Sequence, residues 1–518
     1  MMNPSSSICI EHLPNEILVP ILKSCASPSL SSVCVRWYHL LANEVMPSLY
    51  KQIGKVHVPQ GDVNEQALTL DRIYNLEEEL SRTAKVNAIF RQIFTLARSL
   101  SPSELEFKWI TEEKRYFTLT NYSTYLVNIN RLLMWKEIRG GKEFLDQGEI
   151  KYLPLAKKGE LFKSWIESYG KDMTSLDLRG IGLTFLPPEI GQLSQLQALH
   201  LNNNQLTSLP AEIGQLLQLQ TLDLTDNHLS TLPSEIGQLS QLKRVDLSNN
   251  QLTTLPAEIW QLPQLQNLSL NYNQLTSLPV EIGQLSQLKA LDLDHNQLTF
   301  LPAEIRLLSQ LQLLRLPKNQ LATLPVGIGQ LLQLQELDLK SNHLTALPAE
   351  IGQLSNLKAL WLQNNHLTVL PAEIGCLSGL QELDLCDNQL TSLPVGIGQL
   401  LQLQELDLKS NQFTNLPAEI WQLSQLKKLY LKNNQLTTLP TEIGQLSQLK
   451  KLYLKNNQLT TLPAEIGRLS KLQDLDLNNN QITSLPIEMK GLTALKKLQV
   501  NENPLQSIPD EIKRRFRL

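Results

Sequence analysis

The sequence predicts an α/β solenoid preceded by a helical N-terminal region. Fourteen asparagines recur at intervals of 23 residues from Asn204 to Asn503, and residues 8–172 show no such period. Each asparagine is embedded in the same frame, L-x-L-x-x-N-x-L-x-x-L-P-x-E-I-G-x-L-x-x-L. A fixed period of this length is typical of repeat proteins in which each repeat contacts only its neighbours. A degenerate first repeat, with Ile181 at the asparagine position, brings the expected number to about fifteen over residues 173–518.

Each part of the frame predicts one element of the repeat. The L-x-L segment is a short strand whose leucines point inward and whose intervening residues point outward. Successive strands are expected to pair in parallel as a curved sheet on the concave face, while L-P and E-I-G return the chain on the other side. The asparagine amide both donates and accepts hydrogen bonds, so it can satisfy backbone groups that the turn after the strand leaves unpaired.

An open solenoid needs caps at both ends, because its leucine core would otherwise be exposed. The N-terminal cap is predicted as a helix over residues 157–170, whose apolar face comprises Leu161, Phe162, Trp165, Ile166 and Tyr169. Ile508, Ile512 and Phe516 have helical spacing and predict a C-terminal cap. The expected organisation is therefore a helical module over residues 8–54, a mostly helical spacer and cap over 55–172, and the array over 173–518.

Composition excludes several classes of function. The net charge is −4 and the pI about 6.1, so no global field attracts nucleic acid or an anionic membrane, and no membrane partner is expected. The N-terminus lacks the basic and apolar regions of a Sec signal, although a Ser-rich leader remains an alternative. Five unclustered cysteines favour a reducing, cytoplasmic setting. No C-x-x-C, H-E-x-x-H or phosphate-binding loop is present, so the sequence predicts no enzyme, no cofactor and no metal site.

The variable outward positions carry the candidate target site. Four residues before the asparagine, eight of fifteen repeats have aspartate, which predicts a locally negative stripe. Trp361 interrupts this stripe between Asp338 and Asp384, and an exposed tryptophan is a plausible anchor for a partner. Two later repeats form a basic patch centred on aromatics, comprising Lys428, Tyr430, Lys432, Lys451, Tyr453 and Lys455. The alternative is that strands prefer aromatics in any case, and that the patch arose by duplication of a repeat.

Residues 13–41 resemble the F-box. The matching pieces are Leu13-Pro14-x-Glu16-Ile17-Leu18-x-x-Ile21-Leu22 and Val33-Cys34-x-Arg36-Trp37, ending in Leu40-Leu41. The segment between them is about three residues shorter than usual and contains Pro28. The resemblance implies docking to a Skp-type adaptor of a cullin–RING ubiquitin ligase through Leu13, Pro14, Ile17, Leu18, Ile21, Leu22, Val33 and Trp37. The alternative is an amphipathic helical hairpin that packs on residues 55–172.

The array, with its L-P-x-E-I-G-x-L frame, resembles the bacterial and Ras-suppressor-like leucine-rich repeats. Together with an F-box it is similar to bacterial, symbiont- or effector-like proteins that use the ubiquitination machinery of a host. That resemblance implies a substrate receptor which links a target on the concave face to a Skp-cullin-F-box ligase in the host cytosol. The alternative function is a leucine-rich-repeat scaffold in signalling, with purely structural N-terminal helices.

Overall fold

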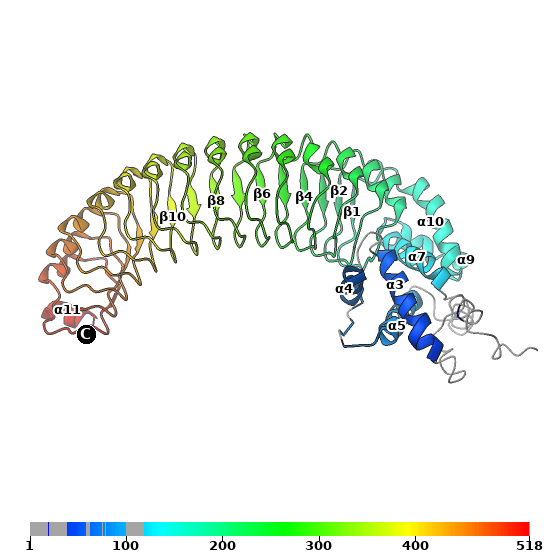
Figure 1. Cartoon of the computed structure of the whole chain (residues 1–518), viewed down its shortest axis with the longest axis horizontal. Coiled ribbons are helices and arrows are strands. Elements are labelled where there is room, and N and C mark those ends of the chain that lie inside the picture. Colours follow the sequence, from blue (N-terminus) through cyan, green and yellow to red (C-terminus); the bar gives the residue numbers. More distant parts are fainter. Residues whose placement is uncertain are drawn as a thin grey trace, which may run out of the picture. The chain divides into compact units, whose positions relative to one another are not determined.

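The computed structural model describes residues 19, 39–57, 63–74, 76–77, 79–99 and 119–516. The chain divides into two compact units, Met1–Leu262 and Pro263–Leu518. In both units short strands alternate along the chain with 3-10 helices, and Figure 1 shows the two kinds of element on separate sides of each repeat. This arrangement confirms the predicted α/β solenoid.

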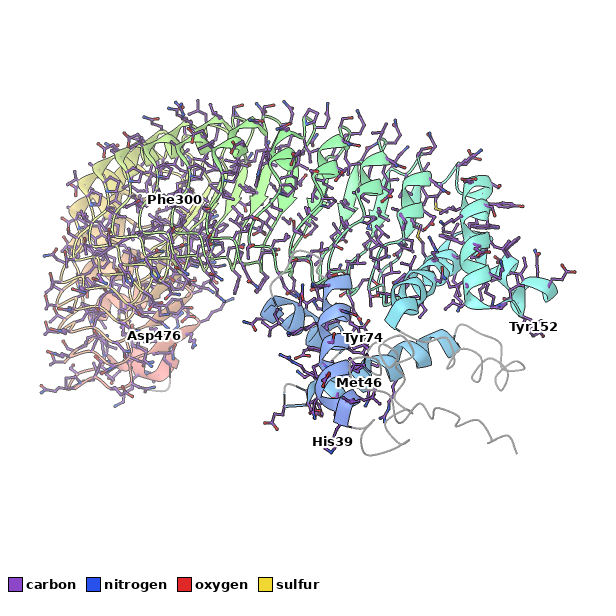
Figure 2. All side chains as sticks on the ribbon, turned by 45° about the vertical axis from the view of Figure 1, so that its right-hand side comes forward. His39, Met46, Tyr74, Tyr152, Phe300 and Asp476 are labelled. Atoms are coloured by element: carbon purple, nitrogen blue, oxygen red, sulfur yellow. The ribbon has the colours of Figure 1, made fainter. Side chains whose placement is uncertain are left out.

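The first unit begins with helices. They are η3 (Leu41–Val45), α3 (Met46–His57), α4 (Val63–Ile73), α5 (Arg82–Ser99), α7 (Leu119–Glu137), α8 (Gly141–Leu145), α9 (Gly148–Lys151) and α10 (Leu155–Tyr169). Helix α3 packs against α4 and α5, and its Leu49 and Ile53 are fully buried. Met46 and Tyr74, labelled in Figure 2, are also buried in this part of the unit. Helix α3 continues without a break past residue 54, where the sequence analysis ended its first module.

Helix α7 is tied to the first repeat by polar contacts. The Arg131 guanidinium donates to both carboxylate oxygens of Glu189, at 3.1 and 2.6 Å. Asn130 Oδ1 accepts the Thr184 backbone N–H at 3.0 Å, and its Nδ2 donates to the Thr184 hydroxyl at 3.1 Å. All four residues are buried or half-buried, so these bonds fix α7 on the open end of the array.

Helix α10 occupies the segment that the sequence predicted as the N-terminal cap helix, residues 157–170. Phe162, Trp165 and Ile166 are buried. The ring centroids of Phe162 and Trp165 lie 5.3 and 5.5 Å from that of Trp135 in α7. Tyr169 stacks on Trp165 but is 66 % exposed, so it covers the aromatic cluster from the solvent side.

The strands are three residues long and pair in parallel, each residue with the one 23 positions later. Those of the first unit are β1 (Ser175–Asp177), β2 (Ala198–His200), β3 (Thr221–Asp223) and β4 (Arg244–Asp246). Those of the second unit are β5 (Asn267–Ser269), β6 (Ala290–Asp292), β7 (Leu313–Arg315), β8 (Glu336–Asp338), β9 (Ala359–Trp361), β10 (Glu382–Asp384), β11 (Glu405–Asp407), β12 (Lys428–Tyr430), β13 (Lys451–Tyr453), β14 (Asp474–Asp476) and β15 (Lys497–Gln499).

The return segments are 3-10 helices that follow proline. They are η5 (Pro188–Gln192), η6 (Ala211–Gln215), η7 (Ser234–Gln238), η8 (Ala257–Gln261), η9 (Val280–Gln284), η10 (Ala303–Leu307), η11 (Val326–Gln330), η12 (Ala349–Gln353), η13 (Ala372–Cys376), η14 (Val395–Gln399), η15 (Ala418–Gln422), η16 (Thr441–Gln445), η17 (Ala464–Arg468) and η18 (Ile487–Gly491). They lie close together, since a Cβ added at Gly352 would lie 2.4 Å from the Glu373 carbonyl oxygen of the next repeat. The glycine of E-I-G therefore permits close stacking.

The asparagines bind the backbone as predicted. Asn319 Oδ1 accepts the Leu298 N–H at 2.9 Å, and its Nδ2 donates to the carbonyls of Leu293 and Leu316 at 2.9 and 3.1 Å. The same pattern recurs along the array, and from Asn204 to Asn480 these asparagines are buried. A feature that sequence reasoning missed is the residue just before each asparagine, which has φ between 49° and 59°. In the degenerate first repeat Gly180 takes this position, with φ 65°.

The C-terminal cap is helix α11 (Asp510–Phe516). Ile512 is buried, while Ile508 precedes the helix and is half-buried, as is Phe516. The last basic residues lie on an exposed side, and Arg515 donates to the Leu495 carbonyl oxygen at 2.8 Å. The helix therefore closes the leucine core at this end.

Candidate functional site on the strand face

The outward-facing side chains of the strands, with those of the two residues after each strand, form a surface that we call the strand face. In every strand the central residue is apolar and points into the core, and its two neighbours point to the opposite side of the sheet. The predicted target-binding residues all lie on this face. Because each strand residue pairs with the residue 23 positions later, two outward-facing side chains are neighbours when they are 23 residues apart.

The aspartate stripe has a structural role that the sequence analysis did not assign. Each of the eight aspartates ends its strand, and its Oδ1 accepts the backbone N–H two residues later at 2.9–3.2 Å. Such a bond is the usual way in which aspartate stabilises a turn, so aspartate followed by a loop was the available signal. Asp338 is only 6 % exposed and its other oxygen lies 3.3 Å from Lys340 Nζ. The stripe is therefore less free to bind a partner than its composition indicates.

Trp361 lies between Asp338 and Asp384 in the sheet register, as predicted. Its indole is half-buried and Nε1 donates to Glu382 Oε1 at 2.9 Å. The ring is thus held in a fixed orientation by a residue of the neighbouring strand. A fixed aromatic ring loses little conformational entropy when a partner binds it.

The two tyrosines of the predicted patch form one unit. Tyr430 and Tyr453 are register partners, and their rings stack with centroids 5.2 Å apart. The Tyr453 hydroxyl donates to Asp474 Oδ2 at 2.8 Å. Partial burial, and then this hydrogen bond, raise the pKa of Tyr453 to about 12. Partial burial also raises the pKa of Tyr430, so both phenols are neutral at physiological pH.

The patch is less basic than its sequence predicts, because two of its four lysines are paired. Lys428 Nζ lies 2.6 Å from Glu405 Oε2. Lys432 Nζ lies 3.3 Å from Asp476 Oδ2 and 4.8 Å from the centre of the Tyr453 ring. Within the part of the chain that the structure describes, Lys451 and Lys455 have no ion pair. The unpaired positive charge of the patch therefore comes from Lys451 and Lys455.

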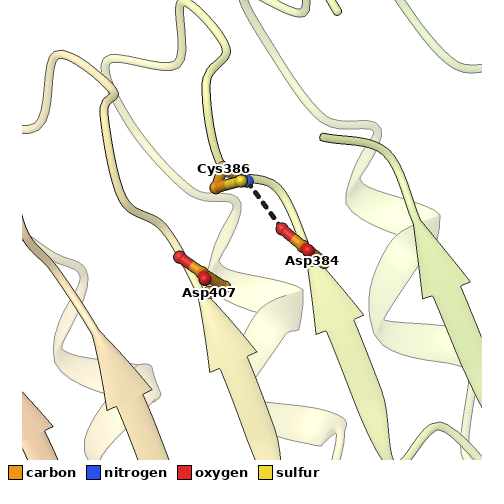
Figure 3. A group of neighbouring side chains, drawn as sticks. All are labelled: Asp384, Cys386 and Asp407. Carbon is orange, nitrogen blue, oxygen red and sulfur yellow. Dashed lines mark hydrogen bonds between the residues drawn. The ribbon is translucent and has the colours of Figure 1, made fainter. Parts of the chain in front are cut away.

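The strand face also brings together Asp384, Cys386 and Asp407 (Figure 3). No motif in the sequence indicated this group, because its members come from two repeats. Burial, and then the charge of Asp384, raise the pKa of the Cys386 thiol. A thiol held in its protonated form is a poor nucleophile, which agrees with the absence of a neighbouring histidine in the sequence.

The predicted adaptor-binding residues, Leu13, Pro14, Ile17, Leu18, Ile21, Leu22, Val33 and Trp37, lie outside the described residues. The last two residues of the F-box-like match are described. Leu40 and Leu41 are 5 % and 1 % exposed, and Leu41 begins η3, which leads directly into α3. The end of the match is therefore joined to the helical bundle of the first unit.

Comparison with known protein families decides what kind of array this is. The model described as "Leucine-rich repeat region" matches residues 176–273, 251–342, 303–392, 374–453 and 438–515, which together cover most of the chain. The chain belongs to the leucine-rich repeat family. Membership points to an interaction scaffold, and it confirms the leucine-rich-repeat part of the sequence interpretation. Among curated proteins, no relative matches the chain.

Solved structures of other leucine-rich repeat proteins are similar to the array. A leucine-rich repeat protein of Leptospira interrogans is 43 % identical and aligns over 68 % of this chain and 95 % of its own, with a TM-score of 0.57. A TDR receptor is 29 % identical over 67 % of this chain and 65 % of its own, with a TM-score of 0.59. An internalin of Listeria monocytogenes is 24 % identical over 67 % of this chain and 95 % of its own, with a TM-score of 0.56, and shares the fold.

Among the described residues, no helix combines the length and the apolar character needed to cross a membrane.

Proposed function

We propose that this leucine-rich repeat protein is a substrate receptor that links a target protein, held on the strand face, to a Skp-cullin-F-box ubiquitin ligase. The leucine-rich repeat fold supports a protein–protein interaction role, and the two-part F-box resemblance of residues 13–41 carries the finer assignment. Catalysis would come from the ligase partners, and this chain would contribute proximity.

The strand face of the second unit offers a target the features of a binding site. Trp361 and the Tyr430–Tyr453 pair are aromatic groups held in place by hydrogen bonding and stacking, and such residues are enriched at interfaces. Lys451 and Lys455 add unpaired positive charge beside the tyrosines. The target surface that fits this combination is acidic and partly apolar.

The N-terminal part supports a physical link between the F-box-like segment and the first repeat. Leu40 and Leu41, which end the F-box-like match, are buried and continue into α3. In the same unit α7 is fixed to the first repeat through Arg131 and Glu189. The similarity of the array to one from Leptospira interrogans supports a bacterial type of array, and we propose that the chain acts as an effector in the cytosol of a host.

The adaptor half of the proposal is tested by co-purification. The full chain is expressed with a eukaryotic Skp-type adaptor, and Leu13→Ala/Pro14→Ala serves as the variant that removes the first contacts. We expect the wild-type chain to retain the adaptor and the variant to lose it. Failure of the wild-type chain to retain the adaptor would overturn the F-box assignment and leave the interaction role of the array intact.

To test target binding on the strand face, the target is first identified by crosslinking and mass spectrometry in cells that express the full chain. Its affinity is then measured for Lys451→Glu/Lys455→Glu and for Trp361→Ala. Lys289→Glu/Lys496→Glu is the charge-matched control, because both lysines lie outside the strand face. We expect the first two variants to weaken binding at least about tenfold, and the control to leave it within about twofold. Equal affinities for all variants would remove the strand face as the target site.

The second candidate function is a scaffold in which the N-terminal helices are structural. The burial of Leu40 and Leu41 in the first unit favours it, because these residues pack inside the chain. This function predicts target binding without adaptor binding. The two experiments above therefore separate the candidates.

A further inference from the structure

Three potential metal ligands converge on the strand face between β10 and β11. Asp384 and Asp407 are register partners at the ends of these strands, and Cys386 follows Asp384 by two residues. The Cys386 sulfur and one oxygen from each carboxylate all lie within 4.8 Å of one another. Figure 3 shows the three side chains facing a common space above the two strands. Cys386 also donates its backbone N–H to Asp384 Oδ1 at 3.0 Å, which fixes the first two ligands relative to each other.

The charge around this group is unbalanced. Two nearby lysines already have partners, since Lys409 Nζ lies 3.7 Å from Asp387 Oδ2 and Lys428 pairs with Glu405. Asp384 and Asp407 are register partners and both are half-buried, so a cation placed among the three donors would offset the repulsion between the two carboxylates.

The chain contains a similar group in which threonine replaces the cysteine. In β3 and β4 the register partners are Asp223 and Asp246, and Thr225 stands where the other group has Cys386. Each group also has an amide oxygen, buried and without a hydrogen-bond partner, one repeat earlier at the position of the cysteine or threonine. These oxygens belong to Gln363 and Asn202 respectively. A soft ligand is therefore added at one of two otherwise similar sites.

We propose that Asp384, Cys386 and Asp407 bind a divalent cation of the zinc type through one thiolate and two carboxylates. Sulfur lies about 2.3 Å and oxygen about 2.1 Å from zinc, so two ligands of one tetrahedral ion are about 3.5 Å apart. The thiol loses its proton when the ion binds, and water or the Gln363 amide oxygen completes the coordination. This site is independent of the proposed ligase function.

The test uses cobalt as a spectroscopic probe for the zinc site. A full-length variant keeps Cys386 as its single cysteine, with Cys9→Ser, Cys25→Ser, Cys34→Ser and Cys376→Ser. Metal-free protein is titrated with Co²⁺ and the thiolate-to-cobalt charge-transfer absorption is recorded. We expect one equivalent to bind with this absorption, and Zn²⁺ to displace it. Circular dichroism shows that each variant retains its fold.

Two variants assign the ligands. Cys386→Thr makes this group equivalent to Asp223, Thr225 and Asp246, so the charge-transfer absorption should disappear. Asp407→Asn retains the thiol but removes one carboxylate, and it should weaken Co²⁺ affinity by about 10-fold or more. The proposal is wrong if the single-cysteine chain shows no charge-transfer absorption, or if Asp407→Asn binds Co²⁺ with unchanged affinity.

Discussion

Tyr430 and Tyr453, register partners on β12 and β13, stack with their ring centroids 5.2 Å apart and their planes inclined by 21°. A stacked aromatic pair contributes about 0.5–1.5 kcal/mol beyond the area it buries. We therefore expect Tyr430→Ala and Tyr453→Ala to be coupled by about 1 kcal/mol in a double-mutant cycle of the unfolding free energy. Chemical denaturation followed by circular dichroism measures the four free energies.

A distant aromatic provides the control for this cycle. Tyr272 stacks on His295 and lies many repeats away from Tyr453. The effects of Tyr272→Ala and Tyr453→Ala on the unfolding free energy should add within about 0.5 kcal/mol. If the Tyr430–Tyr453 cycle is equally additive, the stack does not stabilise the strand face.

The four lysines of the patch should differ in their effect on stability. Lys432 lies over the Tyr453 ring and beside Asp476, whose side chain is only 4 % exposed. Lys432→Ala leaves this buried carboxylate without its cation, so the unfolding free energy should fall by about 1–2 kcal/mol. Lys455→Ala is the matched control and should change it by less than about 0.5 kcal/mol. Equal losses from the two substitutions would contradict the ion pair.

The asparagine ladder should be the most sensitive polar feature of the array. Replacing Asn319 by alanine leaves the Leu298 N–H and the carbonyls of Leu293 and Leu316 without their bonds in a buried site. We expect Asn319→Ala to lower the unfolding free energy by about 2–4 kcal/mol. Gln320 is the next residue and is exposed, so Gln320→Ala should have almost no effect. A loss below about 1 kcal/mol for Asn319→Ala would show that water replaces the amide.

Much of the fold could be predicted because its determinants repeat. The strands and the asparagine bonds follow from a period that is visible in the residues themselves. With the register known, the Lys428–Glu405 pair could also have been found, because these residues are 23 apart. Lys432 and Asp476 do not stand at a multiple of the period, so their ion pair depends on side-chain conformations that no frame encodes. Asp384 and Asp407 are also 23 residues apart, but the approach of the Cys386 sulfur to both carboxylates depends on side-chain conformations that the period does not encode.

Backbone conformation was also invisible in the sequence. The residue before each asparagine has positive φ, yet tyrosine, histidine, lysine, serine and glutamate occur there beside the expected asparagine. Lys318 has φ 49°, a region that asparagine and glycine enter far more readily than lysine. Lys318→Asn should therefore raise the unfolding free energy by about 0.5–1 kcal/mol. Lys289 is an exposed lysine without positive φ, so Lys289→Asn should leave the unfolding free energy unchanged. An increase for both variants would show that the loss of a positive charge, and not the backbone conformation, stabilises the chain.

Tryptophan replaces the glycine of E-I-G in two repeats, and in two others Arg306 and Lys490 stand at this position. Trp260 and Trp421 are each 1 % exposed. The leucine that follows each of these two 3-10 helices has an unusual ψ, 110° at Leu262 and 72° at Leu423. After the other 3-10 helices of the array the corresponding ψ is 57–63°. The backbone has adjusted locally to each indole. Trp421→Gly would restore the consensus and yet leave a large cavity.

We therefore expect Trp421→Gly to lower the unfolding free energy by about 3–5 kcal/mol, although it makes the repeat more regular. The opposite substitution should also be harmful, because Gly352→Ala would place a Cβ 2.4 Å from the Glu373 carbonyl oxygen. Thermal and denaturant unfolding of both variants would measure these effects. A Trp421→Gly variant as stable as the natural chain would mean that neighbouring repeats close the space the indole leaves. In that case the 3-10 helix of this repeat would stack on its neighbours as closely as those that have glycine at this position.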